Sequence, residues 1–230
     1  MSARLRVALL LAALLIAGAC GKSSPGATPL TKSVHTLQPS VVKITAINAV
    51  SATVGSAVYG EVQNLSSSSI GGVQLTLSIT QKNGKVVNTP FPASTMLNVI
   101  PPGATAPFTF PFDGTGVVAA VSATVQAGSV IPVPYDPLTV GTSTASLLGS
   151  AYQVSGTVTN SSGVPITYHN VVATMFDHSG NVVGAADDYG TSDTVTPGGT
   201  SNFDIILTGT GHLVARYTLV AEGRVVAQSK

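Results

Sequence analysis

Hydrophobic and polar residues alternate along much of the chain after residue 40. In residues 73–80, valine, leucine or isoleucine occupies every odd position, and glutamine, threonine or serine occupies every even position. Every second residue is again apolar in residues 108–112 and 203–207. Successive side chains of a β-strand point to opposite faces, so this period of two predicts strands with one buried and one polar face.

Turn residues separate these apolar segments. Asn83-Gly84 and Ser179-Gly180 each lie between two apolar runs, a pattern typical of a tight β-hairpin. Several short strands divided by such turns predict an all-β fold built from antiparallel β-sandwiches. Only the apolar run near the start of the chain has a helical composition.

The chain contains an internal repeat. Residues 58–64 (VYGEVQN) match residues 154–160 (VSGTVTN) at an offset of 96, and residues 102–108 match residues 197–203 at an offset of 95. The matched positions are glycines, prolines and strand apolar residues in the same order. We therefore predict two tandem copies of one sandwich domain.

The repeat sets the predicted domain boundaries. The first sandwich is expected over residues 40–128 and the second over residues 136–230. Residues 129–135 between them contain Pro132 and Pro134, which predict a semi-rigid, extended linker.

The first residues have the three zones of an export signal. Arg4 and Arg6 precede an apolar run over residues 7–17, and small residues follow directly before Cys20. The run is shorter than the roughly 20 residues that span a bilayer, so we predict a signal peptide over residues 1–19. Small residues before a cysteine resemble the lipobox of bacterial lipoproteins. That resemblance implies a lipid on Cys20 and cleavage in front of it.

Cys20 is the only cysteine, so a disulfide within the chain is excluded. The alternative to lipidation is an ordinary secretory signal in which this cysteine is incidental; Ala17 stands where lipoboxes most often have leucine. Residues 20–39 begin with small, polar and proline residues, which predict a flexible spacer. Acyl chains on Cys20 would hold the protein on a membrane, outside the cytoplasm, with the sandwiches facing outward. Which membrane is left open.

The second copy resembles the FxLYD family, immunoglobulin-like sandwich domains common in bacterial and archaeal surface proteins. Residues 156–160 resemble its G-x-V-x-N strand end, and residues 173–177 resemble the motif that names the family, with Ala173 in place of the first aromatic residue. Residues 197–203 resemble its P-G-x-x-x-x-F segment. The resemblance implies two tandem immunoglobulin-like sandwiches and no catalytic activity.

Charge argues against nucleic acid as a partner. Only 8% of the residues are charged; without Arg4 and Arg6, eight basic residues face nine acidic ones. Tryptophan is absent, and aromatic residues are not interleaved with basic ones. The mature chain therefore lacks the basic footprint that binding to phosphates requires.

Three aspartates are the candidates for an ion site. Asp187, Asp188 and Asp193 crowd a segment that is neutral in the first copy, and carboxylate oxygens ligate calcium. Their spacing matches no EF-hand loop, and solvated surface charge is the competing interpretation. The histidines show no metal-site spacing. We expect no catalytic residue and no cofactor.

These observations lead to one main hypothesis about function and one alternative. The main hypothesis is a non-enzymatic envelope lipoprotein whose sandwiches act as a spacer or bind an envelope protein, for example along an exposed sheet edge. The alternative is a lipoprotein that binds a small ligand or calcium, for example in association with a transporter. An enzyme is a third, weaker reading, which a histidine and a carboxylate meeting in space would favour.

Overall fold

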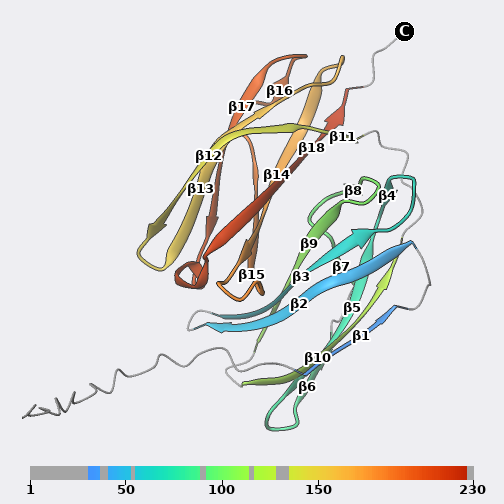
Figure 1. The fold of residues 1–230 in the computed structure, drawn as a ribbon, viewed down its shortest axis with the longest axis vertical. Helices are drawn as coiled ribbons and strands as arrows, with labels where there is room; N and C mark the ends of the chain where they lie inside the picture. Colours follow the sequence, from blue (N-terminus) through green and yellow to red (C-terminus); the bar gives the residue numbers. More distant parts are fainter. Residues whose placement is uncertain are drawn as a thin grey trace, which may run out of the picture.

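The computed structural model describes residues 31–36, 41–52, 55–88, 92–113, 117–127 and 135–226, and every statement below concerns these residues. They form two β-sandwiches, one after the other along the chain (Figure 1). The predicted all-β class, with two tandem antiparallel immunoglobulin-like sandwiches, is confirmed.

In the first sandwich, the sheet remote from the second sandwich is called its outer sheet, and the other its inner sheet. The strands of the outer sheet follow the order β1 (Thr31–Thr36), β10 (Val118–Gln126), β5 (Gln74–Gln81), β6 (Val86–Asn88), with β7 (Ala93–Ser94) also beside β5. Those of the inner sheet are β2 (Val42–Ala52), β3 (Gly55–Asn64) and β9 (Thr105–Phe112). A short pair, β4 (Ile70–Gly71) and β8 (Val99–Ile100), closes one end.

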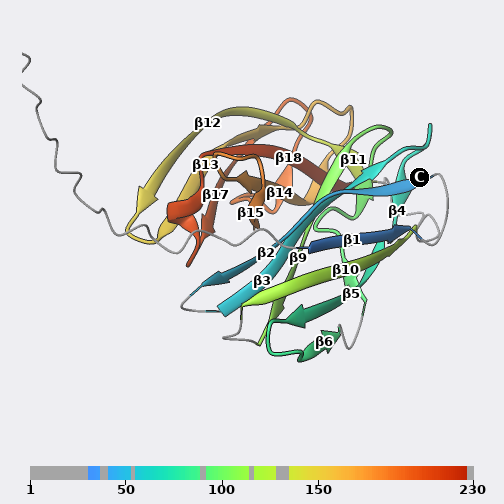
Figure 2. The ribbon, with the colours of Figure 1, turned by 60° about the horizontal axis from the view of Figure 1, so that its bottom comes forward.

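The second sandwich also has a five-stranded and a three-stranded sheet, but here the five-stranded sheet is the inner one. Its inner sheet has the order β11 (Tyr135–Pro137), β18 (Arg216–Val225), β14 (Ile166–Phe176), β15 (Val182–Tyr189), with β16 (Thr194–Val195) also beside β14. Its outer sheet has β12 (Thr139–Leu148), β13 (Ala151–Thr159) and β17 (Thr200–Leu207). A 3-10 turn, η1 (Gly211–Leu213), precedes β18. The sheets are stacked outer, inner, inner, outer (Figure 2).

The alternating pattern and the turns behave as predicted in the first copy. Leu75, Leu77 and Ile79 are fully buried between the two sheets, whereas the polar residues between them are exposed or half-buried. Gly84 and Gly180 turn the two hairpins with φ of 84° and 82°, the left-handed region that glycine enters without steric cost.

Equivalent glycines in the two copies make room for equivalent phenylalanine rings. A side chain on Gly60 would collide with the Phe108 ring and the Ala46 carbonyl, and one on Gly156 would collide with the Phe203 ring. Both rings are almost fully buried. The glycine of G-x-V-x-N and the phenylalanine of P-G-x-x-x-x-F are thus two halves of one packing contact.

In each sandwich, one asparagine side chain joins two backbone segments at one end through hydrogen bonds. Asn64 Nδ2 donates to the carbonyls of Ser68 (2.7 Å) and Ile100 (2.8 Å). Asn160 Nδ2 donates to the carbonyls of Val164 (2.8 Å) and Val195 (2.9 Å). Both side chains are completely buried, so each satisfies backbone groups that water cannot reach.

The structure changes part of the predicted domain boundaries. Strand β1 lies inside the segment predicted as a flexible spacer, where it pairs in parallel with β10. Tyr135, predicted to end the linker, begins β11. Composition could not reveal β1, because hydrogen bonds to a neighbouring strand form it. Arg4, Arg6, Cys20 and linker residues 129–134 lie outside the described residues. Within the described ranges, no helix is long and apolar enough to cross a membrane.

Candidate functional site

Strand β14 departs from the alternating pattern, because both of its faces are covered from His169 to Phe176. Val171, Ala173 and Met175 belong to the core of the second sandwich. Val172 belongs instead to the core cluster of the first sandwich, and the neighbouring Val220 packs on the same cluster. The inner sheet of the second sandwich therefore buries its other face against the first sandwich.

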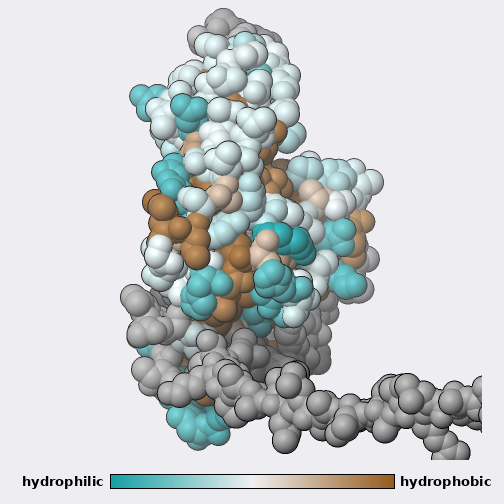
Figure 3. Space-filling model, turned by 60° about the vertical axis from the view of Figure 1, so that its left-hand side comes forward, coloured by the Kyte–Doolittle hydropathy of each residue, from teal (hydrophilic) through white to brown (hydrophobic). Residues whose placement is uncertain are grey.

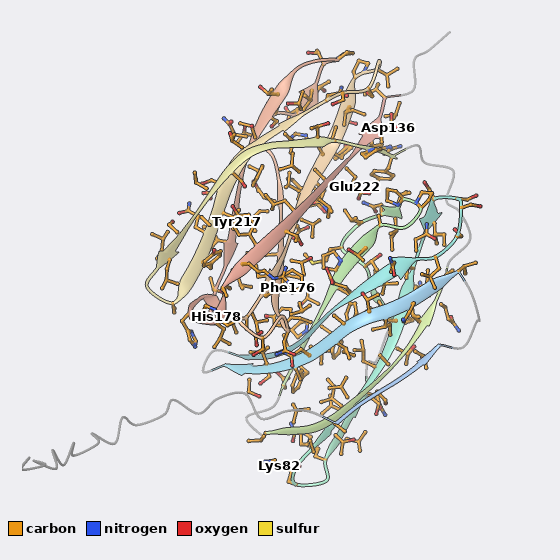
Figure 4. All side chains as sticks on the ribbon, in the orientation of Figure 1. Lys82, Asp136, Phe176, His178, Tyr217 and Glu222 are labelled. Carbon is orange, nitrogen blue, oxygen red and sulfur yellow. The ribbon has the colours of Figure 1, made fainter. Side chains whose placement is uncertain are left out.

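An apolar cluster joins the two inner sheets. Val50 and Tyr59 come from the first sandwich; Phe176, Val182, Val183 and Ala185 come from the second, and Phe176 lies between the sandwiches in Figure 4. Burial raises the pKa of Tyr59, although a hydrogen bond with Thr210 opposes the shift. Fully burying one such side chain contributes about 1.5–3 kcal/mol. The cluster is thus large enough to hold the sandwiches together.

Directional hydrogen bonds add to this interface. Asn48 Nδ2 donates to the Val182 carbonyl at 2.9 Å, and Asn170 Nδ2 donates to the Met96 carbonyl at 3.1 Å. Burial also raises the pKa of Glu61, an effect opposed by a hydrogen bond with Thr174 and by the charge of Arg216. Because hydrogen bonds are directional, they fix the orientation of one sandwich relative to the other more closely than apolar contacts do.

Glu222 on β18 is the most buried acid of the interface, with 4% of its surface exposed. Its Oε1 accepts from the Asn98 backbone N–H and from Asn98 Nδ2, both at 2.7 Å, and its Oε2 accepts from the Val99 N–H at 3.2 Å. Burial raises the pKa of Glu222, and these hydrogen bonds oppose the shift. The carboxylate therefore clamps the end of the first sandwich to β18.

A mostly apolar cavity of about 400 Å³ lies beside this clamp, between the two sandwiches. Leu97, Val99 and Pro101 line it from the first sandwich, and Tyr135, Leu138, Leu219 and Glu222 line it from the second. Its size falls in the range of small-molecule sites. Residues of both sandwiches therefore surround this cavity.

A histidine and a serine meet in the second sandwich, and the charge of a nearby aspartate acts on the histidine. His169 Nε2 lies 2.9 Å from Ser201 Oγ, and both residues are buried. Burial lowers the pKa of His169, whereas the charge of Asp188 raises it. Nucleophilic catalysis would need an accessible serine and a carboxylate on Nδ1. Ser201 is 3% exposed, and Nδ1 has no hydrogen-bond partner among the described residues, so the pair is a structural brace.

The three aspartates of the predicted calcium cluster do not form a metal site. Asp187 and Asp188 are neighbours in β15, so their side chains leave opposite faces of the sheet. Asp188 Oδ2 accepts the Asp204 N–H at 2.7 Å, and Asp193 lies beyond the end of β15. Within the described ranges, no group of three histidine, cysteine, aspartate or glutamate residues could hold a metal. Crowding in sequence did not become crowding in space.

No single sequence motif indicates the residues that join the sandwiches. Glu222, Asn98 and Asn170 stand alone in sequence and match no motif. A signal was nevertheless present in the repeat, because β14 carries Val172 and Phe176 where β5 carries Thr76 and Thr80. An apolar residue in one copy opposite a polar residue in the other indicates a face that only one copy buries.

Comparison with known proteins assigns the chain to no family. No family model and no curated protein matches the sequence. Solved structures that align with parts of this chain include a red sea bream transglutaminase (TM-score 0.25, 13% identity), covering 84% of this chain and 32% of that one. Another is an exo-chitosanase from Amycolatopsis orientalis (TM-score 0.28, 14% identity), covering 77% and 25%.

A third is a tetra-tandem repeat in the extending region of a large adhesion protein (TM-score 0.21, 18% identity), covering 83% of this chain and 45% of that one. The chain thus spans less than half of each of these structures. All three TM-scores are far below 0.5, so nothing about the fold or the function of this chain is inferred from these structures.

Proposed function

We propose that this protein is a non-enzymatic lipoprotein of the bacterial cell envelope, anchored through a lipid on Cys20. In this proposal residues 1–19 are removed by cleavage. The two FxLYD-like sandwiches lie outside the cytoplasm as one rigid arm, which acts as a spacer or binds an envelope protein. The interface between the sandwiches is the observation that carries the proposal. A stiff arm needs its two domains fixed to each other, and the apolar cluster with the Glu222 clamp supplies this.

The anchor is tested by mass spectrometry of the native protein. We expect a mature N-terminus at residue 20 that carries diacylglycerol, and we expect Cys20→Ser to leave the membrane fraction. An unmodified Cys20, or a chain that retains residues 1–19, would overturn the anchor and the localisation that depends on it.

The arm is tested by crosslinking in intact cells followed by affinity purification from membranes. We expect an envelope protein to be recovered with the wild-type chain and not with Cys20→Ser. If no protein is enriched over a mock purification, the partner-binding role is rejected, and only a spacer role is left.

A second candidate function, the binding of a small apolar ligand, is favoured by the 400 Å³ cavity between the sandwiches. Its walls are mostly apolar, and the Glu222 carboxylate lies at one side. Native mass spectrometry of protein purified from its own membranes tests this idea. A bound small molecule would support it, and an unliganded mass throughout would reject it.

A further inference from the structure

We propose that a shallow pocket at the free end of the second sandwich binds a saccharide, with the exposed rings of Tyr168 and Tyr189 as its platform. This site is distinct from the interface, and the inference does not depend on the lipid anchor. It is argued from backbone strain, from the composition of the pocket and from the comparison of the two copies.

Tyr168 has an unusual backbone conformation. Its φ is 47°, and it is the one residue other than glycine with a positive φ among those that the structure describes. It lies in a bulge of β14, where the pairing with β18 shifts between Thr167 and Asn170. A left-handed backbone disfavours any side chain with a Cβ atom, so tyrosine is held here against its own preference.

The first copy has the same backbone bend with glycine. Gly72, 96 residues before Tyr168, has a φ of 61° and lies between β4 and β5, which together correspond to β14. The fold therefore requires the left-handed bend at this position but not a tyrosine. The Tyr168 side chain is 68% exposed, so packing does not offset the strain. A strained and exposed aromatic residue indicates a functional role.

The pocket beside this bulge has a volume of about 490 Å³. Tyr189, which is 65% exposed, flanks it from the end of β15. Hydroxyl groups and one carboxylate complete the wall, contributed by Thr167, Ser192, Asp193 and Thr194. The end of the second sandwich that carries β16 is pale in Figure 3, the colour of intermediate hydropathy.

The wall of the pocket is held in place by the buried brace described above. His169 Nε2 bonds with Ser201 Oγ, and that hydroxyl in turn accepts the Ser192 N–H at 3.3 Å. The Thr191 N–H donates to the Asn202 carbonyl at 3.0 Å. Thr191 and Ser192 are thus fixed to β17, and Thr194 pairs with Thr167 of β14. A wall that is preorganised in this way loses less entropy when a ligand binds.

A saccharide matches this chemistry better than the other ligands that stack on tyrosine. A pyranose ring presents apolar C–H faces to an aromatic ring and hydroxyl groups at its rim, which suit serine, threonine and aspartate. No lysine or arginine lines the pocket, and Asp193 would repel phosphate, which disfavours a nucleotide. A proline-rich peptide would need an apolar groove, whereas the rest of this wall is polar.

The first copy has the left-handed bend but neither of the two tyrosines, so it serves as an internal negative control. Gly72 and Val73 stand in place of Tyr168 and His169, and Ser94 pairs with β5 where Tyr189 pairs with β14. The same end of the first copy is occupied by Glu222 of the second sandwich. The tyrosine pocket is therefore specific to the second copy.

The experiment titrates the full-length Cys20→Ser chain with cellotetraose, chitotetraose and maltotetraose, each to about 10 mM, well above the ~1 mM Kd of a weak site. Saturation-transfer NMR and tyrosine fluorescence report binding; the chain has no tryptophan to mask the tyrosines. We expect at least one oligosaccharide to bind. Tyr189→Ala and Tyr168→Gly should each weaken binding at least tenfold, while the exposed, distant Leu147→Ala should not.

Tyr168→Gly also tests the strain, because it should raise the Tm by about 2–4 °C while binding is lost. A loss of binding with higher stability cannot be explained by misfolding. The proposal is overturned if none of the three sugars binds or if Tyr168→Gly binds normally. It is equally overturned if Tyr168→Gly lowers the Tm, or if a polyproline peptide binds with the same dependence on both tyrosines.

Discussion

Strand β5 and residues 170–176 of β14 occupy equivalent places in the two sandwiches, yet only β5 has a face in contact with solvent. On that face β5 carries Thr76 and Thr80, whereas β14 carries Val172 and Phe176. The core-facing positions are apolar in both. Alternation of apolar and polar residues along a strand therefore reflects burial inside one domain. Loss of this alternation in only one copy of a repeat reflects burial against the neighbouring domain.

The largest effect is expected from a charge on this face. Val172→Asp should lower the free energy of unfolding by about 3–5 kcal/mol, because it buries an unpaired carboxylate between the sandwiches. The matched control Thr76→Asp places the same charge on the exposed face of β5 and should change it by less than about 0.5 kcal/mol. Urea unfolding measures both, and equal effects would contradict the interface.

The shared contact between glycine and phenylalanine should respond alike in both copies. Gly60→Ala and Gly156→Ala should each destabilise the protein by about 1–3 kcal/mol, because the new methyl group overpacks a buried ring. Gly163→Ala is the control, since it has open space around it. Thermal unfolding measures the effects. If only one of the two substitutions lowers the Tm, the prediction that the two cores pack alike is wrong.

The two copies have different residues at the left-handed bend, Gly72 in the first and Tyr168 in the second. Gly72→Ala should cost about 1–2 kcal/mol, because it brings into the first copy the strain that Tyr168 has in the second. Gly163→Ala is again the matched control, since Gly163 has no positive φ. Calorimetry checks the result, and an unchanged Tm would mean that the bend carries no strain in either copy.

The smallest effect concerns the pH dependence of the Glu222 clamp. Burial raises its pKa above the ordinary 4.5, so the folded state binds the proton more readily than the unfolded state. The stability of the wild type relative to Glu222→Gln should be greatest below pH 4.5 and fall as the pH rises through the raised pKa. Urea unfolding between about pH 4 and pH 8 measures the difference, and a constant difference would contradict a raised pKa.

Much of the fold was predictable from sequence, because it depends on local patterns that are present twice. Alternation in residues 73–80 predicted β5, and the dipeptides Asn83-Gly84 and Ser179-Gly180 predicted two hairpins. The repeat predicted that two similar sandwiches follow each other. Strand β1 was not predicted, because it is short and pairs with β10, about 90 residues away in the chain.

The candidate sites were much less predictable. Asp187, Asp188 and Asp193 were singled out because they are close in sequence, and the pleat of β15 separates them. Tyr168, Tyr189 and Thr194 belong to three strands, and no spacing in the chain announces that they line one pocket.

The elements and the architecture of each domain follow from local features of the sequence, because alternation, turn residues and paired glycines and phenylalanines act over short distances or within one repeat. The fold as a whole was needed to show which face of which copy is covered, that Glu222 meets Asn98, and that two tyrosines flank one pocket. The physical reason is that docking two sandwiches sums many weak contacts between residues far apart in the chain, and no local pattern encodes that sum.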